Sequence, residues 1–180
     1  MNKELTGATP ADHSPKTPIE VGLGLVLRPT LNISQTFPPV ITTPPHTKAP
    51  PYDILITLRP PGTIYGGYWE FPGGKVLKKE SIEDCIRREL AEELGIRIHT
   101  FTSLTSRTHT YPHGTVRLHP WLCRLAADSP PPRAIEVADW MWCRLCELDR
   151  YRFPEANAAV MQDVLVTLEH ASIDWGDGAV

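Results

Sequence analysis

The chain has 180 residues, of which 41% are hydrophobic and 22% charged, and its net charge is −3 with a pI near 6.2. This length suits one domain with appended segments, and the charge offers no basic field for duplex nucleic acid. No apolar run approaches the length of a membrane span, so neither duplex nucleic acid nor a membrane is an expected partner.

The first segment, residues 1–17, is polar and has no apolar stretch typical of a secretory signal. We therefore expect a disordered tail and a cytoplasmic protein. Four cysteines do not make a disulfide scaffold and fit a reducing compartment. Two strands are then expected, at Val21–Leu27 and Ile54–Arg59, on either side of an irregular proline-rich insertion at residues 29–51.

The segment Tyr68–Gly74 reads Tyr-Trp-Glu-Phe-Pro-Gly-Gly, which predicts a short aromatic strand running into a glycine loop. Glycines let the backbone pass close to a ligand. A strand, glycine loop and helix in succession place backbone groups beside a phosphate or a metal. An ordinary turn is the alternative if the following helix carries no functional residues.

That helix is expected to begin at Ser81, which can cap it with Asp84 as the reciprocal acceptor of a loose capping box. Apolar side chains within residues 82–86 repeat at helical spacing. At roughly 100° per residue, the same stripe continues through Glu89 and Glu93. Two carboxylates therefore fall where the pattern calls for core.

Unpaired buried carboxylates cost several kcal/mol, so they need cations or protons nearby. Glu92 lies at the edge of the stripe, and Arg88 could pair with Glu80 or Glu92 and hold the set in register. Clustered carboxylate oxygens suit Mg²⁺, with Mn²⁺ possible. The alternative is a solvated acidic helix with salt bridges along its surface.

Further strands are expected near residues 97–107 and 115–125, joined by a turn at 111–114, and at Val137–Arg144 with two tryptophans on one face. A second helix is expected at Glu155–His170, followed by a loose tail at residues 172–180. Strands interleaved with two helices predict a mixed sheet covered on both faces. The expected inner stripe of the second helix comprises Ala156, Val160, Val164 and Leu168.

Two other patterns are weak signals. Cys143 and Cys146 form a C-x-x-C pair, but no second pair stands at zinc spacing, and the segment is typical of a strand end. His109 and His113 are four residues apart, yet the Thr-Tyr-Pro between them opposes a helix. We expect these histidines to flank a hairpin turn rather than to bind a metal.

From Gly74 to Ile96 the chain matches the spacing G-x5-E-x7-R-E-U-x-E-E-x-G-U, with U aliphatic, at every fixed position. This pattern resembles the signature of the Nudix hydrolases, which cleave nucleoside diphosphates linked to another group. The lead-in Trp69–Lys75 is similar to that of the bacterial 8-oxo-dGTP diphosphatases of the MutT type and of a domain in adenine DNA glycosylases. The resemblance runs from about Val21 to Leu168. It implies an α/β fold, a Nudix-type α/β/α sandwich with a mixed β-sheet between helices, over a domain at residues 18–171.

The resemblance also implies site residues. Glu89, Glu92, Glu93 and the Gly73 carbonyl would bind Mg²⁺, with Glu80 and Arg88 in support. Arg59 would contact the nucleotide, Phe71 would lie against the base, and Lys75 would also face substrate. Asn157, in Phe-Pro-Glu-Ala-Asn, would contact the oxidised guanine, although Asn is also common in a first helical turn. Glu93 or Glu136 would act as the base, with Asp139 as the alternative to Glu136.

The implied activity is Mg²⁺-dependent hydrolysis of 8-oxo-dGTP to the monophosphate and pyrophosphate, as in sanitation of the nucleotide pool and DNA repair. A small nucleotide would be the partner; the oligomeric state and the choice between α and β attack stay open. One alternative is another substrate: a different dNTP, a dinucleoside polyphosphate or a nucleotide sugar. The other is a non-catalytic module that binds an oxidised base.

Overall fold

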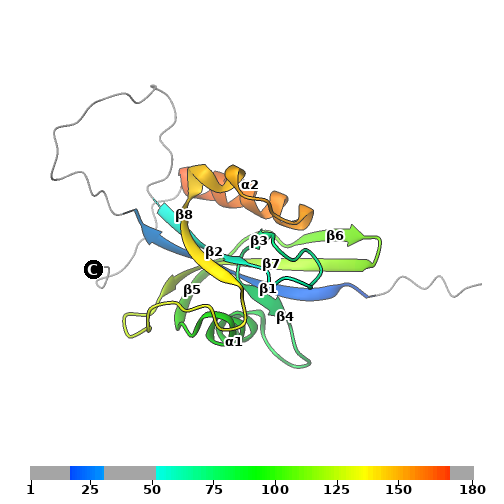
Figure 1. Ribbon diagram of the computed structural model, residues 1–180, viewed down its shortest axis with the longest axis horizontal. Helices are drawn as coiled ribbons and strands as arrows, with labels where there is room; N and C mark the ends of the chain where they lie inside the picture. The colour runs from blue at the N-terminus through cyan, green and yellow to red at the C-terminus, as the bar shows by residue number, and fades with distance from the viewer. Residues whose placement is uncertain (1–16, 31–51, 171–180) are drawn as a thin grey trace, which may run out of the picture.

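The computed structural model describes residues 17–30 and 52–170. In this part of the chain, an eight-stranded mixed sheet lies between helix α1 (Ile82–Leu94) and helix α2 (Glu155–His170), as Figure 1 shows. This is the expected α/β/α sandwich. The expected tails, and residues 31–51 of the expected insertion, lie outside the described residues.

The sheet follows the order β3-β2-β1-β7-β5, while β4 pairs with β1, β6 with β7 and β8 with β2. A short 3₁₀ helix, η1 (Leu145–Arg150), follows the last strand. The strands are β1 (Ile19–Pro29), β2 (Tyr52–Leu58), β3 (Trp69–Glu70), β4 (Gly73–Lys75), β5 (Ile98–Ser103), β6 (Arg107–Tyr111), β7 (Gly114–Leu125) and β8 (Asp139–Arg144).

Strand β1 is shared by both layers of the core. It runs parallel to β7 and antiparallel to β4 and β2. Leu23, Leu25 and Leu27 belong to the cluster under α2, whereas Val26 belongs to the cluster under α1. On the α1 side a Cβ at Gly24 would lie 2.9 Å from Leu90 Cδ2. The missing side chain therefore lets α1 pack close to the sheet.

Helix α1 begins where the sequence predicts. The Asp84 N–H donates to Ser81 Oγ over 3.1 Å, and the Ser81 hydroxyl donates to the Asp84 carboxylate over 2.7 Å. The reciprocal contact is thus made between side chains and not to the Ser81 backbone. Gly95 ends the helix in a left-handed conformation, with φ 68°.

The predicted inner stripe of α2 is confirmed, because all four of its residues are buried in one cluster. Trp140 and Trp142 both pack against the other cluster, as expected for one face of a strand. The strand and helix order is therefore the predicted one through most of the described chain.

The segment at residues 97–107 differs from the expectation of one strand. It contains β5 and begins β6, and both pair with β7, with a bulge between Thr100 and Thr102. The physical reason is the length of β7, which has twelve residues: one end of it pairs with β5 and the other end pairs with β6. The aromatic strand is also shorter than expected, since β3 holds only Trp69 and Glu70.

The proline-rich insertion leaves and rejoins the fold at adjacent strands, because Pro29 at the end of β1 pairs with Tyr52 at the start of β2. From Tyr52 the chain runs through β2 to Arg59, a path of roughly 23 Å at the rise of an extended strand. Pro29 and Tyr52 thus lie at the end of β2 opposite to Arg59.

Candidate active site

Strand β4 brings the glycine loop against α1. Gly74 pairs with Gly22 of β1, and a Cβ at position 74 would lie 2.2 Å from Cδ of Glu89. The Gly73 N–H donates to a carboxylate oxygen of Glu93 over 3.2 Å. Both inward carboxylates of the helical stripe therefore meet the loop. Because Gly74 has no side chain, the Glu89 carboxylate can occupy the space that a Cβ at position 74 would fill.

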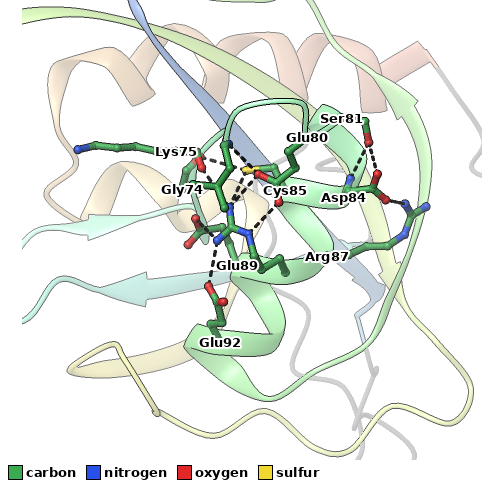
Figure 2. Close-up of polar contacts among 11 residues, drawn as sticks. Gly74, Lys75, Glu80, Ser81, Asp84, Cys85, Arg87, Glu89 and Glu92 are labelled. Carbon is green, nitrogen blue, oxygen red and sulfur yellow. Dashed lines mark hydrogen bonds and ion pairs between the residues drawn. The ribbon is translucent and has the colours of Figure 1, made fainter.

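Arg88 gathers three glutamates around one guanidinium group (Figure 2). It forms a two-point contact with Glu80, at 2.8 and 3.0 Å, and its Nη1 lies 2.7 Å from Glu89 and 3.0 Å from Glu92. Its Nη2 also donates to the Lys75 carbonyl over 3.1 Å. The hydrogen bond from Arg88 lowers the pKa of Glu80 to about 2. The predicted pairing of Arg88 with Glu80 and Glu92 is confirmed.

Arg59 forms a second ion pair that the sequence analysis did not identify. Its Nη1 lies 2.6 Å from Glu70 Oε2, and its Nε donates to the Ile64 carbonyl over 2.8 Å. Burial raises the pKa of Glu70, and the positive charge of Arg59 opposes that shift. The available signal was an acidic residue in an otherwise aromatic strand, where a charge needs a partner.

Glu93 is a partly buried carboxyl group beside two other glutamates. Burial, followed by the charges of Glu70 and Glu89, raises the pKa of Glu93 to about 8. The Gly73 N–H and the charge of Arg59 act in the opposite direction but do not cancel the shift. The site therefore stabilises additional positive charge beside this carboxyl group.

Within residues 17–30 and 52–170, no three His, Cys, Asp or Glu side chains are grouped as a metal-binding cluster. Glu89 and Glu92 instead turn toward Arg88, and the Glu92 side chain is 47% exposed. The donor chemistry nevertheless fits a hard divalent cation, because Glu89 and Glu93 present carboxylate oxygens at the glycine loop. The assignment of Gly73, Glu89, Glu92 and Glu93 as metal ligands remains a prediction.

Another predicted site residue, Asn157, lies at the start of α2. Asn157 is only 7% exposed, and its Oδ1 has no hydrogen-bond partner among the described residues. One residue earlier, the Ala156 N–H donates to the Tyr111 hydroxyl over 3.2 Å. Arg59 pairs with Glu70 and donates to the Ile64 carbonyl, and the ring of the next residue, Tyr65, lies against Tyr111. These contacts connect Arg59 to the start of α2.

The remaining predicted site residues lie in different surroundings. Phe71 is 1% exposed and packs on Phe153, with ring centroids 5.5 Å apart, so it is part of the core; its contact with a base remains a prediction. Lys75 is exposed, and its side chain extends away from the carboxylates in Figure 2. Glu136 is exposed, and its N–H donates to the Glu93 carbonyl over 3.3 Å. Asp139 is also exposed and accepts from the Trp140 N–H.

The weak signals have structural explanations. Cys143 and Cys146 are free thiols, the first buried in β8 and the second exposed in η1. The expected hairpin turn is present, but only His109 lies beside it, in β6, whereas His113 is part of the turn between β6 and β7. Both histidine rings contact the Tyr111 ring. Their partner is thus an aromatic ring, which sequence spacing alone did not indicate.

The chain is similar to known proteins. The NUDIX domain family matches residues 49–163. The chain is 38% identical to an 8-oxo-dGTP diphosphatase of Buchnera aphidicola over 93 residues, covering 52% of this chain and 73% of that protein. It is also 38% identical to a CTP pyrophosphohydrolase of Escherichia coli over 109 residues, covering 61% of this chain and 79% of the relative.

Solved structures extend the similarity to the fold. A structure from a study of MutT of Aliivibrio salmonicida and Vibrio cholerae superposes with a TM-score of 0.54 at 27% identity, covering 84% of this chain and 99% of that chain. The chain therefore belongs to the Nudix family, and it is a pyrophosphohydrolase similar to the MutT group. The alternative of a non-catalytic binding module is not supported.

No helix of the described residues is long and apolar enough to cross a membrane. The cytoplasmic location remains a prediction.

Proposed function

We propose that this protein hydrolyses 8-oxo-dGTP to 8-oxo-dGMP and pyrophosphate with the help of a divalent cation, Mg²⁺ or Mn²⁺. The observation that carries the substrate choice is the buried Asn157 Oδ1, which has no partner among the described residues. A buried amide oxygen without a donor is costly, and oxidation at C8 gives guanine an N7–H donor. Support also comes from the relative named 8-oxo-dGTP diphosphatase.

The chain offers distinct groups to the two ends of such a nucleotide. The triphosphate would lie at the glycine loop and the α1 carboxylates, and the base at Asn157. Arg59, which is near both, would hold the phosphates and stabilise charge on the leaving oxygens. Arg88 would keep Glu89 and Glu92 in place.

Hydrolysis would add water across a phosphoanhydride bond, releasing the monophosphate and pyrophosphate. When bound at Glu89, Glu92, Glu93 and the Gly73 carbonyl, the divalent cation supplies charge neutralisation for the triphosphate and acidifies the attacking water. Glu93 or Glu136 would accept the proton of that water. The backbone bond between Glu136 N–H and the Glu93 carbonyl keeps these two residues adjacent.

A second candidate substrate is CTP, favoured by the relative named CTP pyrophosphohydrolase. Cytosine has a different hydrogen-bonding edge, so Asn157 would meet other donors in that case. The glycine loop and carboxylates would act in the same way on either triphosphate.

The decisive experiment compares kcat/KM for 8-oxo-dGTP, dGTP, CTP, a dinucleoside polyphosphate and a nucleotide sugar in the presence of Mg²⁺. We expect pyrophosphate release with a clear preference for 8-oxo-dGTP over dGTP. A higher kcat/KM for CTP would select the second candidate, and release of orthophosphate alone would exclude the proposed cleavage.

Two isosteric variants assign the base. Glu93→Gln should reduce kcat about 100-fold or more if this carboxylate takes the proton, and Glu136→Gln should do so if that residue acts instead. Circular dichroism of both variants verifies that each remains folded. Near-normal turnover of Glu93→Gln would remove Glu93 from the proposed chemistry.

A further inference from the structure

Helix α2 begins without a local side-chain cap. The residue before it, Pro154, has no side-chain oxygen that could accept from the first free N–H groups of the helix. The Ala156 N–H in this first turn instead donates to the Tyr111 hydroxyl over 3.2 Å, from a residue 45 positions earlier in the chain. Tyr111 at the end of β6 thus replaces the cap that a Ser or Asp would supply.

The Tyr111 ring is itself fixed. Its centroid lies 4.3 Å from that of His109, 5.1 Å from that of His113 and 5.5 Å from that of Tyr65. The residue is 9% exposed. Because three rings surround it, the position of its hydroxyl is set by the β6–β7 hairpin and by the loop before β3.

Asn157 follows directly after the residue that Tyr111 holds. Its N–H donates to the Pro154 carbonyl over 3.0 Å, so its backbone belongs to the same first turn. Its buried Oδ1 has no partner among the described residues, and the direction of that oxygen depends on where the turn begins. A rotation of the first turn would redirect the amide.

We propose that Tyr111 is a positioning residue for base recognition: its hydroxyl fixes the first turn of α2 and thereby the direction in which Asn157 presents its side-chain amide. This inference rests on the proposed function and adds to it, because it places a determinant of specificity on the β6–β7 hairpin. Tyr111 is not expected to touch the reacting phosphates. Its effect should therefore fall on substrate preference and not on the chemical step.

The test is a double-mutant cycle with Tyr111→Phe and Asn157→Ala. Tyr111→Phe keeps the ring but removes the acceptor, and we expect the kcat/KM ratio of 8-oxo-dGTP to dGTP to fall about fivefold, the size of one neutral hydrogen bond. In the Asn157→Ala background the same change should leave the ratio unaltered. Equal, independent losses in both backgrounds would overturn the proposal.

Tyr65→Phe is the matched control. The Tyr65 ring contacts Tyr111, but its hydroxyl makes no hydrogen bond within residues 17–30 and 52–170. The preference ratio should therefore be unchanged in this variant. An equal loss in Tyr65→Phe would mean that the ratio reports general packing of the aromatic cluster, which would also overturn the proposal.

A measurement without substrate separates this inference from the proposed function. In Tyr111→Phe, hydrogen exchange of the Ala156 amide should accelerate about fivefold, and the side-chain amide resonances of Asn157 should shift. Unchanged exchange and resonances would overturn the positioning role. A wild-type protein without preference for 8-oxo-dGTP would instead contradict the proposed function, while the amide measurements would still decide the role of Tyr111.

Discussion

At the scale of single residues, the site is defined by how each carboxylate is compensated. Glu80 is held by a two-point contact with Arg88, and Glu70 by Arg59. Glu93 has only a backbone N–H as its hydrogen-bond donor among the described residues, and its pKa is raised to about 8. The carboxylate with the least compensation is therefore the one that a bound cation would affect most.

Glu93 should make the metal-free protein less stable at high pH. Its folded-state pKa of about 8 lies above the ordinary pKa of a glutamate, 4.5, so its contribution to stability is complete below about pH 4.5 and is lost as the pH rises toward 8. Urea unfolding with a chelator should show a loss on the order of 3 kcal/mol between about pH 5 and about pH 9. Glu93→Gln should lack most of this loss; an unchanged pH dependence in the variant would contradict the assignment.

Gly74→Ala should displace the Glu89 carboxylate, because the new Cβ would lie 2.2 Å from Glu89 Cδ. We expect kcat/KM to fall at least about tenfold, with a change below about 1 kcal/mol in the free energy of unfolding, since the displaced group ends a flexible side chain. In a Glu89→Ala background the same substitution should add little. A similar loss in both backgrounds would show that position 74 acts independently of Glu89.

At the scale of elements, helix α1 has two different faces. One contacts the sheet through Ile86, Leu90 and Leu94, which are fully buried. The other carries exposed ion pairs of Arg87 with Glu83 and Asp84. Glu89 and Glu93, the predicted metal ligands, lie between these faces, where the glycine loop approaches the helix. The helix therefore provides both the core contact and the site.

Arg88→Lys should destabilise the protein by about 1–3 kcal/mol, because a single ammonium cannot replace the forked contacts to Glu80, Glu89 and Glu92. Arg87→Lys, one residue away on the exposed face, is the matched control and should change stability by less than about 0.5 kcal/mol. Equal effects in urea unfolding would indicate that the Arg88 contacts contribute no more than surface pairs.

At the scale of the whole molecule, the sequence predicts the fold more completely than it predicts the contacts of the site. Periodicity located both helices, and the Nudix spacing placed Glu89, Glu93 and the glycine loop together, because helical geometry and a close glycine contact are local properties. The pairing of Arg59 with Glu70 and the cap that Tyr111 provides to α2 depend on contacts between distant segments. No local pattern encodes such contacts.

Mg²⁺ should stabilise the whole fold, since a cation that binds only the folded state shifts the unfolding equilibrium by mass action. The rise in Tm on adding Mg²⁺ should be larger at about pH 8 than at about pH 6, because Glu93 must lose its proton to bind the cation. Thermal unfolding of wild-type and Glu93→Gln proteins, each with and without the metal, tests this. An equal rise at both pH values would contradict it.

The parallel pairing of β1 with β7 has a consequence for how the chain reaches this state. Residues 19–26 find their partners only at residues 116–123, so the central strand cannot be completed until nearly a hundred further residues have left the ribosome. Until then the edge of β1 that pairs with β7 has no strand partner. We therefore expect biosynthesis to include an interval in which this open edge can pair with other chains.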